Sequence, residues 1–335
     1  KNLLKLADNY SQKDRMIGCG LALHISPSNV PMNFAYSLVF GLLSGNNNII
    51  RLPSKKYIQT EILIRIINKI LKKKKFNNFK NKICLIKYNK SDEISNYLSK
   101  LSDIRIIWGG DETIKKFKQY ETPARCIDVT FPDRYSLSIL GTKSLKSLNT
   151  YDFTRIIKRF YNDTYTMDQK GCSSPQAIVW LGKENKKIKE KFYKLLSKIA
   201  INNFDQNLAV TNEKISKLSL IAANSKLNFK LKFKNFNLVV VKLKNFNTEI
   251  EKIRPYNGTF VEINTNNLRE IKKIISKKCQ TVTYFGIESK KIKNFVIESG
   301  LSGVDRIVPV GRALDMNLIW DGKDLIFSLS RIIAK

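Results

Sequence analysis

The sequence predicts an α/β fold: a doubly wound parallel sheet followed by a second α/β region. Short apolar runs alternate with helical patterns through the first 140 residues. These runs are apolar at successive positions, as in parallel strands that are buried on both faces. The chain has 335 residues, which is long enough for two domains or one large α/β unit.

The first strand–helix unit begins at residues 18–25, which we expect to form a buried strand. Pro31 then stands where the first turn of a helix tolerates a residue without an N–H group. An almost wholly apolar helix follows through Leu43, and Gly45 ends it. Residues 48–52 are the second predicted strand.

An amphipathic helix follows the second strand. Its apolar residues recur at helical spacing and predict one apolar face, made of Ile58, Ile62, Leu63, Ile66, Ile67 and Ile70. Further strands are expected at 83–88, 104–108 and 126–131, with helices at 92–101 and from Asp111. Such repeated strand–helix units predict a sheet whose carboxyl strand ends bind ligands.

A second α/β region runs from about Tyr151 to Ser302. Its helices are rich in lysine and amphipathic, and we read their lysines as solvated side chains. Its strands are expected at 177–181, 238–243, 259–263 and 281–285.

Cys172 lies in a turn of small residues, Gly171-Cys172-Ser173-Ser174, which Pro175 closes before an apolar run. Small side chains leave the sulfur accessible and the neighbouring backbone N–H groups uncovered. This turn favours a nucleophile, although the reactivity of a thiol depends on a pKa that the sequence does not supply. A cysteine without chemistry in an ordinary loop is the alternative.

The five cysteines are an odd number, are widely scattered and contain no CxxC pair, and His24 is the only histidine. This pattern argues against a disulfide framework or a metal site and fits a reducing cytoplasm. The apolar stretch from Phe34 to Leu43 is too short to cross a bilayer, so no membrane span is expected. The net charge of +32 comes from lysines spread along the whole chain. Without basic clusters interleaved with aromatic residues, it favours an anionic cofactor or acidic carrier protein over nucleic acid.

Gly109 and Gly110 stand between a predicted strand and a predicted helix. Bare backbone N–H groups at the start of a helix favour phosphate. The GxGxxG dinucleotide fingerprint is absent from the sequence, and glycines also end strands for steric reasons alone, so both interpretations remain open at this point.

Several motifs, in order along the chain, resemble the aldehyde dehydrogenase superfamily. They are most similar to its fatty acyl-CoA reductase branch, typified by the reductase of bacterial bioluminescence. Each motif is weak alone, but together they span nearly the whole chain. The matching stretches are residues 24–31, 43–51, 107–114, 131–136, 171–176 and 305–322.

The resemblance implies an aldehyde-dehydrogenase-like fold in which Cys172 accepts the acyl group and Asn29 donates a hydrogen bond to the oxyanion. It implies a nicotinamide-binding domain at 1–148 that lacks the family's N-terminal portion. A catalytic domain follows at 149–304, and a segment at 305–335 packs back on the cofactor domain. It also implies cofactor contacts by Ser26, Pro27, Arg51, Ser54, Lys55, Gly109, Gly110 and Thr113. No metal ligand is implied.

Lys55 stands where related enzymes place a glutamate that binds the ribose hydroxyls. A cation there favours a 2′-phosphate, so we expect NADPH (NADP⁺) as the cofactor. Ser138 stands where aldehyde-oxidising members place the glutamate that activates water. Without that base, water is a poor acceptor for a thioester, which favours hydride reduction instead.

The resulting hypothesis is the NADPH-dependent reduction of a long-chain fatty acyl thioester to the fatty aldehyde through a thioester on Cys172. The expected partner is fatty acyl-CoA or an acyl-carrying synthetase or carrier protein, and a homo-oligomer is compatible with the sequence. The alternatives are a hydrolytic aldehyde dehydrogenase and a catalytically inactive basic scaffold.

Overall fold

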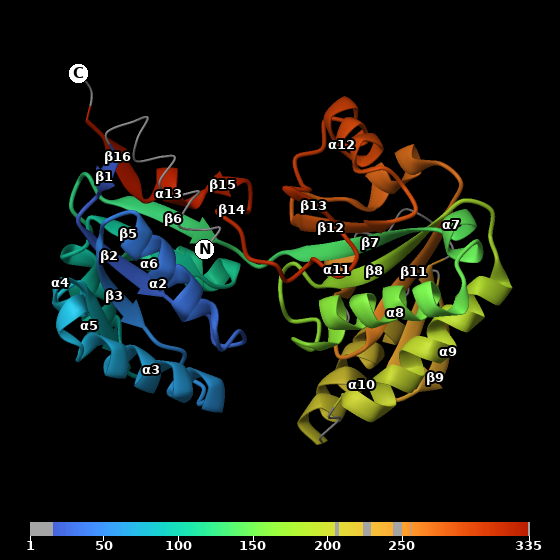
Figure 1. Ribbon diagram of the computed structural model, residues 1–335, viewed down its shortest axis with the longest axis horizontal. Helices are drawn as coiled ribbons and strands as arrows, with labels where there is room; N and C mark the ends of the chain where they lie inside the picture. The colour runs from blue at the N-terminus through green and yellow to red at the C-terminus, as the bar shows by residue number, and fades with distance from the viewer. Residues whose placement is uncertain (1–15, 205–207, 224–228, 244–249, 255, 334–335) are drawn as a thin grey trace. The chain divides into compact units, whose positions relative to one another are not determined.

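Two large sheets organise the chain, one in each of two units (Figure 1), and two two-stranded sheets lie in unit 1. The computed structural model describes residues 16–333 except 205–207, 224–228, 244–249 and 255. Unit 1 comprises residues 1–133 and 316–335, and unit 2 comprises residues 134–315.

The sheet of unit 1 is parallel throughout and has the strand order β4-β3-β2-β5-β6. This confirms the predicted doubly wound sheet. The strand order reverses between β2 and β5, and in such sheets ligands bind at the carboxyl ends of the strands beside that point. The strands are β2 (Leu21–Ile25), β3 (Asn47–Arg51), β4 (Ile83–Ile86), β5 (Ile104–Trp108) and β6 (Ile127–Phe131).

The helices of this unit are α2 (Asn33–Leu43), α3 (Ile58–Leu71), α4 (Asn77–Lys80), α5 (Asp92–Lys100) and α6 (Asp111–Gln119), with a 3₁₀ turn at Lys74–Phe76. In α2, Phe34 and Leu38 are buried against Ile50 of β3. The apolar character of α2 thus follows from its burial against the sheet.

The predicted apolar face of α3 is partly wrong. Leu63, Ile64 and Ile67 pack on the cluster around Phe34. Ile58, Ile62, Ile66 and Ile70 are exposed instead, at 73%, 45%, 47% and 38%. Each step of four residues turns an α-helix about 40° beyond a full circle, so a strict i+4 series winds away from the face that meets the sheet.

The sheet of unit 2 has the order β13-β12-β7-β8-β11-β10-β9, and all its pairs are parallel except β9 with β10. Its strands are β7 (Tyr135–Gly141), β8 (Pro175–Leu181), β9 (Phe229–Asn235), β10 (Leu238–Leu243), β11 (Thr259–Thr265), β12 (Cys279–Phe285) and β13 (Arg306–Pro309).

Helices cover both faces of this sheet (Figure 1). Helices α8 (Thr150–Tyr165) and α9 (Lys186–Asn203) pack on the face that carries Trp180, and α12 (Ser289–Glu298) packs on the opposite face. The remaining elements are α7 (Thr142–Lys146), α10 (Leu208–Ala223), α11 (Ile250–Ile253) and a 3₁₀ helix at Leu268–Ile274.

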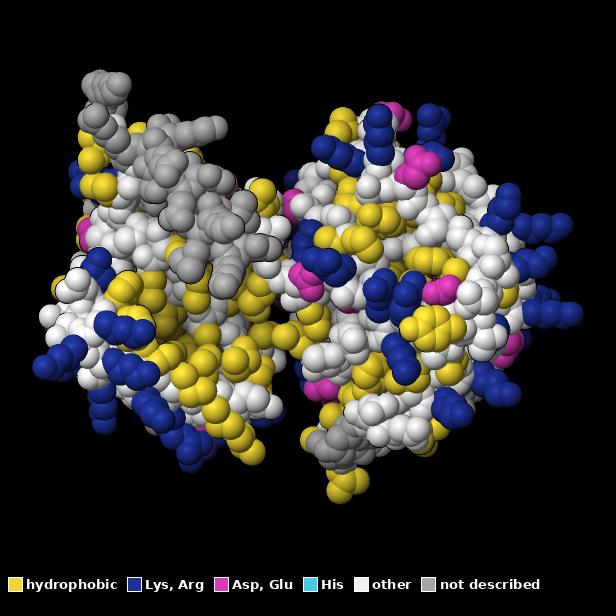
Figure 2. All heavy atoms as spheres, viewed as in Figure 1, with side chains coloured by type: hydrophobic (Ala, Val, Ile, Leu, Met, Phe, Trp, Pro, Cys, Tyr) yellow, Lys and Arg dark blue, Asp and Glu magenta, His cyan; other side chains and the backbone are white. Residues whose placement is uncertain are grey.

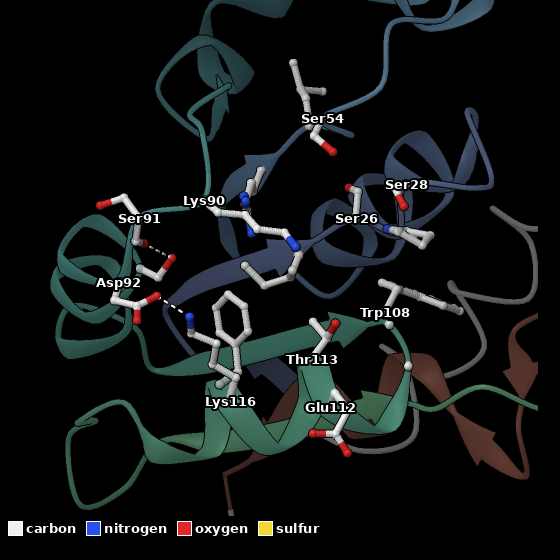
Figure 3. A pocket seen from close by; sticks show the side chains of 18 of the residues that line it. Ser26, Ser28, Ser54, Lys90, Ser91, Asp92, Trp108, Glu112, Thr113 and Lys116 are labelled. Atoms are coloured by element: carbon white, nitrogen blue, oxygen red, sulfur yellow. Dashed lines mark hydrogen bonds and ion pairs between the residues drawn. The ribbon is translucent and has the colours of Figure 1, made fainter.

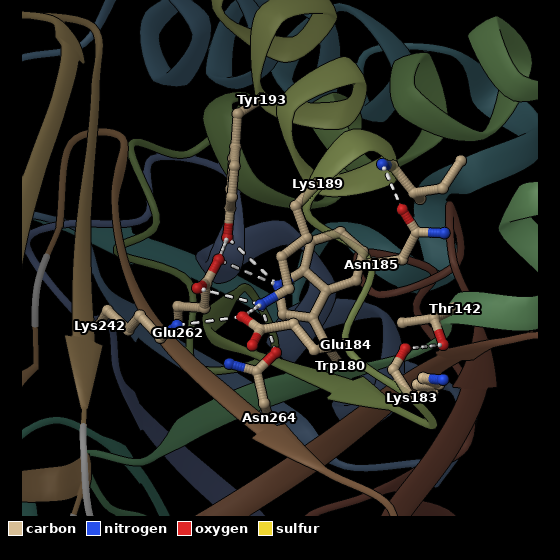
Figure 4. Close-up of polar contacts among 11 residues, drawn as sticks. Thr142, Trp180, Lys183, Glu184, Asn185, Lys189, Tyr193, Lys242, Glu262 and Asn264 are labelled. Atoms are coloured by element: carbon tan, nitrogen blue, oxygen red, sulfur yellow. Dashed lines mark hydrogen bonds and ion pairs between the residues drawn. The ribbon is translucent and has the colours of Figure 1, made fainter.

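A charged network is buried where α9 meets the sheet (Figure 4). Glu262 is 2% exposed and accepts hydrogen bonds from Lys189 (3.2 Å), Tyr193 (2.6 Å) and Trp180 (3.2 Å). A buried carboxylate is costly unless it is paired and hydrogen-bonded, and this one is both. The network therefore fixes the position of α9 on the sheet.

The boundaries between the two units lie at 133/134 and 315/316, whereas the sequence-based boundaries were 148/149 and 304/305. Strand β7 pairs with β8 and β12, so it belongs to unit 2. At the other end, β13 pairs with β12, and the chain returns to unit 1 only from Met316.

The segment that returns to unit 1 from Met316 is held there by hydrogen bonds to its backbone. Strand β16 (Ser330–Ile332) pairs antiparallel with β1 (Met16–Gly18). The Asn46 side chain donates to the carbonyl of Leu329 (2.8 Å), and the Tyr36 hydroxyl donates to the carbonyl of Asn317 (2.7 Å). Between these contacts lie β14 (Ile319–Trp320), β15 (Lys323–Asp324) and α13 (Leu325–Ser328).

His24 on β2 is fully buried between α2 and β3. Trp108 donates to the Ser37 hydroxyl (3.1 Å), which donates in turn to His24 Nδ1 (2.7 Å). His24 Nε2–H then donates to the side-chain oxygen of Asn48 (3.0 Å). Burial lowers the pKa of His24 to about 4, so the neutral ring is a structural link between three elements.

We predict that the ring of His24 stays neutral in the folded protein until the pH falls to about 4. Between the ordinary pKa of about 6.5 and this value, the unfolded chain binds a proton that the folded chain does not. Unit 1 therefore loses stability as the pH falls through this window. NMR titration of the only histidine measures the midpoint directly, and a midpoint near 6.5 contradicts the prediction.

Candidate functional site

A cavity of about 400 Å³ opens at the carboxyl ends of β2, β3 and β5 in unit 1 (Figure 3). It lies where the strand order reverses, which is the expected ligand position in a doubly wound sheet. The cavity brings together most of the sequence-predicted residues of this unit: Ser26, Pro27, Asn29, Arg51, Ser54, Gly109, Gly110 and Thr113.

Ser26 follows β2 directly, and its backbone N–H donates to the carbonyl of Arg51 on the neighbouring strand (3.2 Å). Its side-chain hydroxyl is buried at the cavity and has no hydrogen-bond partner among the described residues. A buried hydroxyl without a partner is unfavourable. The Ser26 hydroxyl is therefore a hydrogen-bonding group beside the cavity that the described residues leave unpaired.

Gly109 and Gly110 form the turn between β5 and α6, and Gly110 is the residue that precedes the first turn of the helix. A Cβ at Gly109 would lie 3.0 Å from the Thr113 side chain, whereas a Cβ at Gly110 would project into open space. The backbone at the start of α6 is thus accessible from the cavity, as phosphate binding at a helix N-terminus requires.

Three cations line the cavity: Arg51, Lys90 and Lys116. The Arg51 guanidinium lies 4.5 Å from the centre of the Tyr88 ring. Lys116 pairs with Asp92, which raises the pKa of Lys116 and lowers that of Asp92. In Figure 3 the Lys90 side chain extends into the cavity from the segment between β4 and α5.

Lys55 directly follows Ser54, which lines the cavity. It is exposed, its ammonium group lies 5.3 Å from the centre of the Tyr57 ring, and it is not among the described residues that line the cavity. Sequence reasoning missed Lys90 because no motif marks it. The sequence signal that could have indicated Lys90 was its position a few residues after β4. The carboxyl ends of β4, β3 and β2 lie along the same edge of the parallel sheet.

Cys172 is half-buried in unit 2, in the turn between α8 and β8. Ser136 of β7 donates its hydroxyl hydrogen to the carbonyl of Cys172 (2.7 Å). Gln280 of β12 donates a side-chain N–H to the Cys172 sulfur (3.3 Å). These hydrogen bonds fix the turn to β7 and β12, which are paired neighbours in the sheet.

Gln169 holds the start of this turn. Asp168 and Gln169 have positive φ angles of 52° and 57°, which cost energy for residues other than glycine. The buried Gln169 amide donates to the carbonyls of Pro175 (3.1 Å) and Thr259 (3.2 Å). It also accepts from the N–H groups of Gly258 (2.7 Å) and Thr259 (3.2 Å).

Burial disfavours nucleophilic chemistry at three of the other cysteines, Cys19, Cys126 and Cys279. Desolvation raises the pKa of Cys279 to about 12, and it also raises the pKa of Cys19 and Cys126. A thiol with a raised pKa is rarely ionised at neutral pH. Cys84 is exposed on β4, so it provides an accessible comparison for Cys172.

Asn29 and Cys172, the two predicted catalytic residues, belong to different units. Ser138 is fully buried on β7, and its hydroxyl has no partner among the described residues.

Within the same described ranges, no helix is long and apolar enough to span a bilayer. No group of three or more His, Cys, Asp or Glu residues in them is arranged to hold a metal ion.

Comparisons with known proteins show the family and the fold of this chain. The model of a family described as acyl-CoA reductase (LuxC) matches residues 4–334. A long-chain acyl-protein thioester reductase of Aliivibrio fischeri is 26% identical over 203 residues, which cover 57% of this chain and 40% of that protein. The chain thus matches less than half the length of this curated relative.

Solved aldehyde dehydrogenase structures share the fold. One is the glyceraldehyde-3-phosphate dehydrogenase of Methanocaldococcus jannaschii complexed with NADP, with a TM-score of 0.67 and 15% identity over 98% of this chain and 78% of that one. Another is an NAD-dependent benzaldehyde dehydrogenase of Corynebacterium glutamicum, with a TM-score of 0.67 and 10% identity over 94% and 68%. The aldehyde-dehydrogenase-like fold predicted from the sequence is confirmed.

We predict that Ser26→Ala has opposite effects on the free and the cofactor-bound protein. Removing a buried hydroxyl that lacks a partner leaves the melting temperature without cofactor unchanged or higher. A lost hydrogen bond to the cofactor weakens its binding about fivefold, equivalent to about 1 kcal/mol. Thermal melts and fluorescence titration with NADPH measure the two effects. Unchanged affinity together with a lower melting temperature contradicts the prediction.

Proposed function

Because the chain belongs to the acyl-CoA reductase (LuxC) family, we propose that it reduces a long-chain fatty acyl thioester to the fatty aldehyde. In this reaction Cys172 is the covalent nucleophile and NADPH is the reductant. The observation that carries the proposal is the half-buried Cys172 sulfur, in a turn that hydrogen bonds hold to β7 and β12.

The Cys172 thiolate attacks the acyl carbon of the donor thioester. The bond between that carbon and the donor sulfur breaks, the donor thiolate leaves, and the acyl group remains on Cys172. The side-chain amide of Asn29 and the backbone N–H of Cys172 donate hydrogen bonds to the oxygen that becomes negative. After reduction the bond to Cys172 breaks, which releases the aldehyde and restores the thiolate.

NADPH supplies the hydride when it is bound. The cavity of unit 1 suits such a cofactor through three features: the unpartnered Ser26 hydroxyl, the open backbone at Gly110 and the cations that line it. Arg51 and Lys90 supply positive charge suited to the 2′-phosphate that distinguishes NADPH from NADH. The assignment of Lys55 to the same phosphate remains part of the proposal and is tested below.

Ser138 supports the reductive direction. A serine hydroxyl is too weak a base to activate water, and a general base contributes roughly 10²–10⁴ in rate. Fatty acyl-CoA and an acyl-carrying synthetase or carrier protein are the proposed donors. The chain's net charge of +32 favours approach of an acidic carrier. Action in the cytoplasm is proposed from the scattered cysteines.

We predict that Cys172→Ala abolishes acylation, because the other cysteines lack an equivalent turn. Intact-mass spectrometry after incubation with palmitoyl-CoA reports the added acyl group. Cys84→Ala is the matched control, since it removes the exposed thiol, and it acylates like the wild type. Acylation of Cys172→Ala excludes the mechanism. Free acid instead of aldehyde in the presence of NADPH indicates a hydrolytic enzyme.

We predict that Arg51→Ala and Lys90→Ala each weaken NADPH binding about five- to tenfold and leave NADH binding nearly unchanged. A cation near a phosphate in a water-exposed cavity contributes about 1 kcal/mol. Lys55→Ala tests the sequence-based assignment in the same titration. Lys56→Ala is the control, because it removes the same charge from the same exposed loop. Equal losses for NADPH and NADH contradict the assignment.

A further inference from the structure

Strand β12 carries a bulge beside the Cys172 turn. Cys279 pairs with Tyr135 and Val282 with Leu137, so three residue steps on β12 face two on β7. The extra residue falls at Gln280–Thr281. A bulge re-aims the side chains of the strand that contains it and is common beside active sites. Here it accompanies a glutamine amide that contacts the predicted nucleophile.

The Gln280 side chain is buried, at 1% exposure, and its Nε2 lies 3.3 Å from the Cys172 Sγ. In this orientation the NH₂ group points toward the sulfur, and the amide oxygen accepts a hydrogen bond from the Thr281 hydroxyl (3.3 Å). The reversed amide would place an oxygen lone pair against the sulfur, which is unfavourable once that sulfur is anionic.

The bulge and the turn are also joined through Ser136. The backbone N–H of Thr281 donates to the Ser136 hydroxyl oxygen (3.0 Å), and that hydroxyl donates to the carbonyl of Cys172 (2.7 Å). Two hydrogen-bonded paths therefore link the same bulge to the same turn. One path fixes the backbone that carries the thiol, and the other reaches the sulfur itself.

We propose that Gln280 is a catalytic residue whose side-chain N–H stabilises the anionic form of the Cys172 sulfur. A hydrogen bond to a charged group is stronger than one to its neutral form. The thiolate exists twice in the proposed reaction, before it attacks the acyl carbon and after the aldehyde leaves. Gln280 lowers the energy of both states. This inference rests on the proposed function, since it assigns a role within that reaction.

Charged groups also lie on the elements around the turn. Lys170 pairs with Glu213 (2.7 Å), Arg134 pairs with Asp305, and Asp163 accepts from the N–H groups of Gly311 and Ala313. Asp168 lies within the turn itself. Substitution of Gln280 leaves all of these groups in place, so a changed ionisation of the thiol is attributable to the lost amide.

The test follows alkylation of Cys172 by iodoacetamide across a range of pH. Peptide mass spectrometry separates Cys172 from the other cysteines. Gln280→Met keeps the length and volume of the side chain without the N–H donor. We expect the midpoint of its pH profile to rise by about one unit, so that alkylation at pH 7 is about tenfold slower. Gln280→Glu, which replaces the donor with a carboxylate, shifts the profile at least as far.

Thr283→Val is the matched control, because Thr283 is buried on the same strand and its hydroxyl has no partner among the described residues. Its pH profile stays that of the wild type. A wild-type midpoint in folded Gln280→Met overturns the inference, and Gln280→Leu, which is also uncharged and lacks the donor, provides the same comparison if Gln280→Met does not fold. Absence of acylation in the wild type overturns the proposed function instead, while the alkylation profile still reports the hydrogen bond.

Discussion

The buried amide of Gln169 is the constraint on which the catalytic turn depends. The backbone leaves α8 through two residues of positive φ, a conformation that costs of order 1 kcal/mol or more per residue. Four hydrogen bonds from one side chain to the backbone of Pro175, Gly258 and Thr259 offset that cost. All four of its hydrogen-bonding positions are used, so the amide has one favourable orientation.

The two units contribute different chemistry to the proposed reaction. Unit 1 presents a cavity with cations and an open helix start, features that suit a phosphate-rich cofactor. Unit 2 presents a thiol held between strands. The excess of lysine elsewhere does not select a cofactor, because the Lys and Arg side chains are spread over the exposed surface shown in Figure 2. Only the cations that line the cavity bear on cofactor choice.

Local sequence patterns predicted the five strands of the parallel sheet in unit 1, but not β7, β9 or β13 of unit 2. Residues 104–108 form β5 as expected, since a short, mostly apolar run of five residues is typical of a buried strand and too short for most helices. Nonlocal features were not predictable. Strand β7 belongs to unit 2 because its partners are β8 and β12, which follow much later in the chain. The exposed face of α3 was misassigned because an i+4 series looks amphipathic whichever side the sheet occupies.

The candidate site also combines residues that local sequence indicates with residues that it does not. Cys172, Ser26 and Gly110 lie in turns that the small and turn-forming residues around them predict from the sequence. Gln280 carries no local signal, since its contact with Cys172 arises from a bulge between strands more than 100 residues apart in the chain. Lys90 likewise follows a strand without a motif, and its place in the cavity depends on how three parallel strands align their ends.

A neutral donor suits a sulfur that must both attack and leave. Nucleophilicity of a thiolate falls as its pKa falls, whereas its ability to leave improves. A cation beside the sulfur lowers the thiol pKa strongly and would favour departure at the expense of attack. The uncharged Gln280 amide stabilises the anion more modestly, which preserves attack on the acyl carbon while easing release of the aldehyde. The buried bulge that holds Gln280 thus balances the two halves of the proposed reaction.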